Sequence, residues 1–207
     1  MATDLARTGR VSTGDRFAIW FFIVVGALLA AWSVVFAIAR IVAVLPNRDV
    51  EVPAVFSGTI AQAPIGPGGA AVPVELNEAV LTVPQLPVAS LVALVVQQIV
   101  AAATITTVVV CLLVLAWSTL RDRVFSRRNT RLVTVTGLVG VVGYAGTAFF
   151  GNMAANGAFA VLSDGSFDNI VMTVDLLPYL LAAFVAALAS TIFGLGARLQ
   201  RETEGLV

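Results

Sequence analysis

Four long apolar stretches divide this chain, and polar or proline-rich segments separate them. The first begins with 23 uncharged residues, Phe17 to Ala39, which as a helix would span about 34 Å and cross a hydrocarbon layer of about 30 Å. The same reasoning predicts four membrane-spanning helices, over residues 17–45, 88–117, 132–150 and 176–197. A signal peptide cleaved after Ala39 is the competing interpretation of the first stretch. Its apolar core exceeds the roughly 7–15 residues of a signal peptide, which favours an uncleaved anchor.

The segment between the first two stretches, residues 46–87, differs in composition. It holds seven of the eight prolines, which exclude a continuous helix. Its alternating runs DVEVPAVF, AVPVEL and AVLTV predict strands, and proline restricts such strands to edge positions. In the loop of residues 151–175, the alternation of Ile170, Met172 and Val174 predicts one more strand. The predicted fold class is an all-α integral membrane protein, a four-transmembrane-helix bundle with a small β-rich extracytoplasmic cap.

The composition indicates that a bilayer is the solvent of this chain. Of its 207 residues, 59% are hydrophobic and 12% are charged, so the chain carries more apolar surface than a soluble core of this size could bury. The formal net charge is zero, but the charges are segregated. All twelve basic residues are arginine, because the chain has neither lysine nor histidine.

The distribution of arginine predicts the orientation. Ten of the twelve lie in residues 1–16, residues 118–131 and residues 198–207, so the positive-inside rule places both tails and the turn between the second and third helices in the cytoplasm. Localisation in the plasma membrane, as a multi-pass protein, follows. The turn is the most basic of these segments, and we expect its arginines to contact anionic lipid headgroups or a protein partner. These arginines are Arg121, Arg123, Arg127, Arg128 and Arg131.

Small residues recur along the third and fourth predicted helices. In lipid, small side chains let two helix backbones approach closely, so we expect these two helices to pack along such residues. The predicted packing residues are Gly137, Gly140, Gly143, Gly146, Ala182, Ala186, Ser190 and Gly194. Ser126 is a predicted N-cap of the third helix. The amides and hydroxyls of the second helix, among them Gln97 and Gln98, are predicted to find partners on a neighbouring helix.

Arg40 interrupts the first apolar stretch near its outer end. The simpler interpretation is that its side chain extends to the outer headgroups. The alternative is an ion pair with an acid of the outer loops, for which Asp175 is a candidate. Such a pair would lock that loop to the first helix.

The residue types present exclude the common intramembrane chemistries. Without histidine there is no HExxH zinc site, no Ser-His dyad and no bis-histidine haem site, and without lysine there is no Ser-Lys pair. Asp164 and Asp168 lack the spacing of a calcium loop. We therefore expect no catalytic residue, no cofactor, no metal and no enzymatic activity.

Three function classes remain, of which an enzyme is the least favoured, because only a reaction of the Asp and Glu side chains of the outer loops stays open to it. The favoured one is an interaction, sensing or regulatory component that meets a protein partner or a second copy of itself, with no direct contact to nucleic acid. The alternative is a small oligomeric transporter or channel lined by the polar residues of the second helix. No acid lies within a predicted span to couple protons to transport, which favours the first class.

Two short motifs resemble a known family. The turn RDRVFSRRNTR opens the third span with a basic residue followed by Phe-Ser-x-x-Asn, and the chain ends with GARLQRETEGLV. Both resemble the YoaS-type family of four-span bacterial membrane proteins. That family is of unknown function, so the resemblance implies the layout over residues 17–207 and no substrate, cofactor or catalytic residue.

Overall fold

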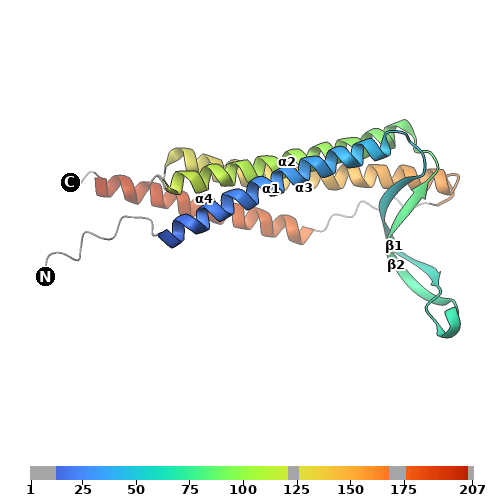
Figure 1. Cartoon of the computed structure of the whole chain (residues 1–207). Helices are drawn as coiled ribbons and strands as arrows, with labels where there is room; N and C mark the ends of the chain where they lie inside the picture. Colours follow the sequence, from blue (N-terminus) through green and yellow to red (C-terminus); the bar gives the residue numbers. More distant parts are fainter. Residues whose placement is uncertain (1–12, 121–125, 168–175, 205–207) are drawn as a thin grey trace. The chain divides into compact units, whose positions relative to one another are not determined.

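The structure is a computed structural model that describes residues 13–120, 126–167 and 176–204 (Figure 1). These residues form four long helices and one two-stranded antiparallel sheet. In chain order the elements are α1 (Thr13–Val44), β1 (Val50–Ala63), a short 3-10 turn (Pro67–Gly69), β2 (Val72–Val83), α2 (Val88–Leu120), α3 (Arg127–Leu162) and α4 (Leu176–Glu204).

All four helices are long and apolar enough to cross a membrane. Little of their apolar surface is covered by the rest of the chain: at most 11% of the most apolar window of any helix is buried. Leu28 and Trp32 of α1, for example, are largely exposed. The prediction of four long apolar helices with a small β element is confirmed.

Two compact units make up the chain. The α4 unit consists of Met1–Val34, Ala102–Val142 and Leu177–Val207. The hairpin unit consists of Val35–Ala101 and Gly143–Leu176. Segments of α1, α2 and α3 contribute to both, and each unit is described by itself below.

The third helix is longer than predicted. It begins at Arg127 and continues to Leu162, so residues 151–162, which we predicted to be loop, are helical. Gly151 and Gly157 favour a loop locally, but tertiary packing outweighs helix propensity. Ala154 and Ala158, on the same stretch, are fully buried in the core of the hairpin unit. The predicted strand around Ile170 lies outside the described residues.

The helix ends also differ from the prediction around the arginine-rich turn. Helix α2 extends to Leu120 and α3 begins at Arg127, so three of the five turn arginines lie in the first turns of a helix rather than in a loop. Helix α4 continues to Glu204, whereas the prediction began a tail at residue 198.

The strands β1 and β2 form one hairpin, where the sequence suggested three short strands. AVPVEL and AVLTV belong to the single strand β2, which pairs with β1 from Val50↔Val83 to Ala63↔Val72. Pro53 and Pro73 lie within the paired strands. Each strand of a two-stranded sheet has one free edge, so a proline without an N–H is tolerated there.

A β-bulge divides the hairpin into two parts. The register shifts between Val55 and Thr59, and Gly58 adopts φ +72°, a conformation that favours glycine. Before the bulge, Val50, Val52 and Ala54 are buried. We call the part beyond it, residues 59–76, the hairpin arm.

The core of the hairpin unit joins the hairpin base to three helix segments. Its buried members are Val44, Val50, Val52, Ala54, Val83, Leu86, Ala93, Leu94, Ala154, Ala155, Ala158 and Phe159. The ring of Phe56 contacts that of Phe159 edge-on, with 5.0 Å between centroids. The base of the hairpin is therefore fixed by burial on α2 and α3.

Polar contacts close the base of this hairpin. Asn47 donates from Nδ2 to the Leu86 carbonyl at 2.9 Å and accepts at Oδ1 from the Leu86 N–H at 2.8 Å. The N–H of Asp49 donates to the Pro84 carbonyl at 3.2 Å. One asparagine side chain thus satisfies both backbone groups of Leu86 and joins the two ends of the hairpin.

Candidate functional site

The arginine-bearing end of α3 is ordered by a cap and a buried amide. Ser126 Oγ accepts from the Asn129 N–H at 3.2 Å, which confirms the predicted N-cap. The side chain of Asn129 is buried and donates from Nδ2 to Ser118 Oγ of α2 at 2.6 Å. This contact ties the start of α3 to the end of α2.

The described arginines of this end project outward. Arg127, Arg128 and Arg131 of α3 are exposed, and so is Arg198 near the end of α4. Arg121 and Arg123, the other two predicted contact residues, lie outside the described residues. The end of the α4 unit therefore presents at least four guanidinium groups.

Helices α3 and α4 approach closely at one of the predicted small residues. A Cβ on Gly137 would lie 2.3 Å from Ala186 Cβ, so this contact requires glycine. One turn away, Thr134 Oγ1 and Ser190 Oγ share a hydrogen bond at 3.2 Å. These two contacts hold α4 against α3.

The remaining predicted packing residues have other surroundings. Within the part of the chain that the structure describes, no atom lies within 4 Å of a Cβ built on Gly140 or on Gly194. A Cβ on Gly146 would lie 3.3 Å from Val100 of α2, so this glycine faces α2. Gly143 is buried, whereas Ala182 is exposed.

The closest approach of α2 to α3 uses glycines that we did not predict as packing residues. A Cβ on Gly157 would lie 1.8 Å from Ser90 Oγ, and one on Gly151 would lie 2.5 Å from Gln97 Nε2. Gln97 thus contacts a neighbouring helix, as expected for an amide in this setting. Both glycines were assigned to a loop from the sequence, which concealed their role.

Arg40 of α1 has a main-chain partner among the described residues, and its alternative pairing with Asp175 stays a prediction. Its Nη2 donates to the backbone carbonyl of Glu51 on β1, and Asp175 lies outside the described residues. Arg40 therefore connects α1 to the hairpin through a main-chain acceptor. Hydropathy and charge patterns carry no signal for such an acceptor.

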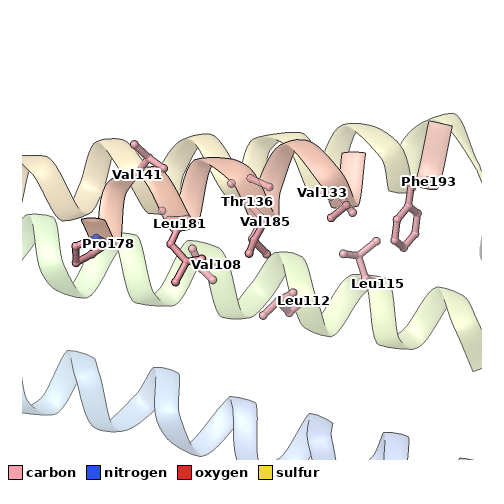
Figure 2. Close-up of a pocket in the computed structure, with 15 residues that line it drawn as sticks. Val108, Leu112, Leu115, Val133, Thr136, Val141, Pro178, Leu181, Val185 and Phe193 are labelled. Atoms are coloured by element: carbon pink, nitrogen blue, oxygen red, sulfur yellow. The ribbon is translucent and has the colours of Figure 1, made fainter. Parts of the chain in front are cut away.

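A groove of about 750 Å³ lies between α2, α3 and α4 within the α4 unit (Figure 2). Among its described lining residues, Thr136 has the single side-chain hydroxyl, and this hydroxyl donates to the Leu132 carbonyl of its own helix at 2.7 Å. The other lining residues are Val108, Leu112, Leu115, Val133, Gly137, Gly140, Val141, Pro178, Leu181, Ala182, Val185, Ala186, Ala189 and Phe193. The groove therefore suits an apolar occupant.

The hairpin arm has one apolar face. The paired residues Thr59↔Leu76, Ala61↔Val74 and Ala63↔Val72 alternate with Ile60↔Glu75 and Gln62↔Pro73, and alternate pairs point to opposite faces of a strand pair. The members of the first set are only partly buried, and none belongs to the core of the hairpin unit.

Among the described residues, no group of three or more His, Cys, Asp or Glu side chains is arranged to hold a metal ion. No family model, curated protein or solved structure matches the chain.

Proposed function

We propose that this chain is a multi-pass protein of the plasma membrane that crosses the bilayer four times with both termini in the cytoplasm. The exposed apolar side chains of all four helices support insertion, because lipid can cover what the protein leaves bare. The exposed arginines of α3 and α4 lie at the end that the positive-inside rule assigns to the cytoplasm. The hairpin would then lie outside.

Within this frame, we propose that the protein is an interaction component whose hairpin arm docks a protein partner. The observation that carries this proposal is the apolar face of the arm, which lies outside the core that fixes the hairpin base. An isolated two-stranded hairpin is marginally stable in water. A partner that covers this face would stabilise the arm.

The free edge of β1 suits strand addition. In β2 the arm carries Pro73, which cannot donate a hydrogen bond to a new strand. In β1 the arm, residues 59–63, has no proline, so its edge can pair with an extended segment of a partner. Ile65, which follows this strand, is 70% exposed and adds apolar surface at the end of the edge.

Site-specific photocrosslinking in native membranes tests the arm. A photoreactive residue at Ile65 is expected to give one dominant protein adduct, whereas the same residue at Thr82, which is exposed near the hairpin base, gives none. Ala61→Glu places a charge on the apolar face and should reduce the adduct at least tenfold. The neighbouring Gln62→Glu, on the opposite face, should leave it unchanged.

Three outcomes would overturn the docking proposal. Equal adducts from Ile65 and Thr82 would show that the arm has no selective contact. An adduct insensitive to Ala61→Glu would show that the apolar face is not involved. An adduct with a second copy of this chain would replace a foreign partner with self-association.

The other expectations from the sequence are also proposals. Absence of enzymatic activity rests on the missing histidine and lysine, and membership of the YoaS-type family rests on the two short motifs. The alternative of an oligomeric channel lined by Gln97, Gln98 and neighbouring threonines is disfavoured, because Gln97 lies against Gly151 in the contact between α2 and α3.

A further inference from the structure

We infer that α3 carries the contact surface of a homodimer, in which two copies of this chain lie side by side in the bilayer with their third helices parallel. The surface is a row of seven residues with the spacing of a coiled coil, and it ends in two asparagines. This inference goes beyond the docking of a partner at the hairpin arm and requires only that all copies are inserted in the same orientation.

Seven positions of α3 repeat with alternating steps of three and four residues. Helix α3 runs without interruption from Arg127 to Leu162 (Figure 1), so such positions form one stripe along the helix, as the a and d positions of a heptad do. The stripe is about 32 Å long, close to the hydrocarbon thickness of about 30 Å. Its members, which we call the α3 seam, are Val135, Leu138, Val142, Ala145, Phe149, Asn152 and Asn156.

The large apolar members of the α3 seam are exposed. Leu138, Val142 and Phe149 are 63%, 61% and 54% exposed. The contact of α3 with α4 uses another side of the helix, because Gly137, which abuts Ala186, precedes Leu138 by one residue and therefore points about 100° away from it. The α3 seam thus faces the surroundings of the chain.

Two asparagines distinguish the α3 seam from a surface that only lipid covers. In the parts of the chain that the structure describes, the side-chain amides of Asn152 and Asn156 have no hydrogen-bond partner. Each amide carries both donors and an acceptor, and such side chains hydrogen-bond across the contacts between membrane helices. An acyl chain offers neither group, whereas the same seam of a second copy offers both.

A two-fold axis along the membrane normal pairs each seam residue with its own counterpart. Copies inserted in one orientation have parallel third helices, and a closed dimer buries the same surface on both subunits. Each asparagine then meets the same asparagine of the second copy, so that the donor of one amide faces the acceptor of the other. This electrostatic complementarity fixes the register, as asparagine at such a position does in coiled coils in water.

Disulfide crosslinking in native membranes tests the α3 seam. The single cysteine, Cys111, is first replaced by alanine. In this background, Val142→Cys is expected to form a disulfide-linked dimer on oxidation at least tenfold faster than Tyr144→Cys, because a disulfide needs two Cα atoms within about 7 Å. Tyr144 is the matched control, since it is also exposed but lies two residues further along α3, on the opposite side of the helix.

A second comparison tests the asparagines. Asn152→Ala combined with Asn156→Ala should weaken dimerisation roughly tenfold, or by about 1.4 kcal/mol, as measured by energy transfer between labelled copies at increasing dilution in phospholipid vesicles. Gln98→Ala is the matched control, because it removes an amide that also has no described partner but lies on α2, outside the α3 seam. It should leave the affinity unchanged, and circular dichroism checks that each variant retains its helices.

Three results would contradict the dimer. Equal oxidation rates for Val142→Cys and Tyr144→Cys would indicate random collisions and assign the α3 seam to lipid. A disulfide with another protein would assign it to a foreign partner. Equal affinities for the double asparagine variant and the unmodified chain would remove the contact that sets the register. The photocrosslinked adduct at Ile65 reports the hairpin arm separately, because Ile65 does not belong to α3.

Discussion

Asn47 provides the sharpest test of how the hairpin is held. Its side chain forms two hydrogen bonds with the backbone of Leu86, and its own backbone adopts φ +52°. Two variants therefore separate the contribution of the side-chain hydrogen bonds from that of the backbone conformation. Asn47→Gly removes the hydrogen bonds but tolerates the positive φ, whereas Asn47→Ala removes the hydrogen bonds and adds backbone strain.

The expected magnitudes follow from these contacts. Each hydrogen bond contributes about 0.5–1.5 kcal/mol net, and the buried N–H of Leu86 would lose its acceptor. We expect Asn47→Gly to lower the free energy of unfolding by about 2 kcal/mol. For Asn47→Ala we add about 1 kcal/mol, because a residue with a Cβ is disfavoured in the left-handed region. The total is about 3 kcal/mol.

Denaturant unfolding in detergent micelles, followed by circular dichroism, measures these differences. Hydrogen exchange at the Leu86 amide reports the local contact directly and should accelerate in both variants. Asn77→Ala is the matched control, because Asn77 is an exposed asparagine of β2, and it should change the free energy of unfolding by less than about 0.5 kcal/mol. If Asn47→Ala and Asn47→Gly both behave like this control, the proposed closure of the hairpin is refuted.

Three further predictions concern the contacts between elements. Gly157→Val should destabilise the protein by about 3 kcal/mol or more in the same unfolding assay, because its Cβ would lie 1.8 Å from Ser90 Oγ; a stability equal to that of Gly140→Val, at a position of the same helix where a Cβ meets no described neighbour, would contradict the α2–α3 contact. Ala186→Leu and Gly143→Leu should each lower the melting temperature in detergent, since one residue abuts Gly137 and the other is buried; unchanged melting temperatures for both would count against tight helix packing. Arg40→Gln should accelerate hydrogen exchange in β1 near Glu51 by weakening the bond to its carbonyl; exchange identical to that of Arg48→Gln would show that this bond is not formed.

The sequence predicted the elements that a single strong pattern defines. Four uncharged stretches predicted α1, α2, α3 and α4, and alternation between Val50 and Val83 predicted strands. Ser126 was recognisable as a cap because its hydroxyl and its position before an apolar run are local features. These signals require no knowledge of the neighbouring element.

Features that depend on a neighbour were missed. Glycine favours loops in soluble proteins, but it also allows close contact between packed helices. Gly151 and Gly157 were therefore predicted to lie in a loop, whereas in the structure they lie in α3 against Gln97 and Ser90 of α2. The partner of Gly146 is on α2, which the spacing of small residues on α3 and α4 did not indicate.

The groove and the hairpin closure illustrate the same limit. The groove arises from the way in which small residues of α3 and α4 leave space beside Gly140, and neither helix alone predicts it. The bond of Arg40 to the Glu51 carbonyl and the bonds of Asn47 to Leu86 use main-chain groups, which are present at every position and therefore carry no sequence signal.

Orientation in the membrane is the claim on which the proposed function depends. Paired reporters measure it most directly, with alkaline phosphatase or a fluorescent protein fused after Arg128 or inserted after Gly68 at the tip of the hairpin. We predict that phosphatase is inactive after Arg128 and active after Gly68, with fluorescence in the opposite pattern. Phosphatase activity after Arg128, or fluorescence from the hairpin tip, would contradict the account.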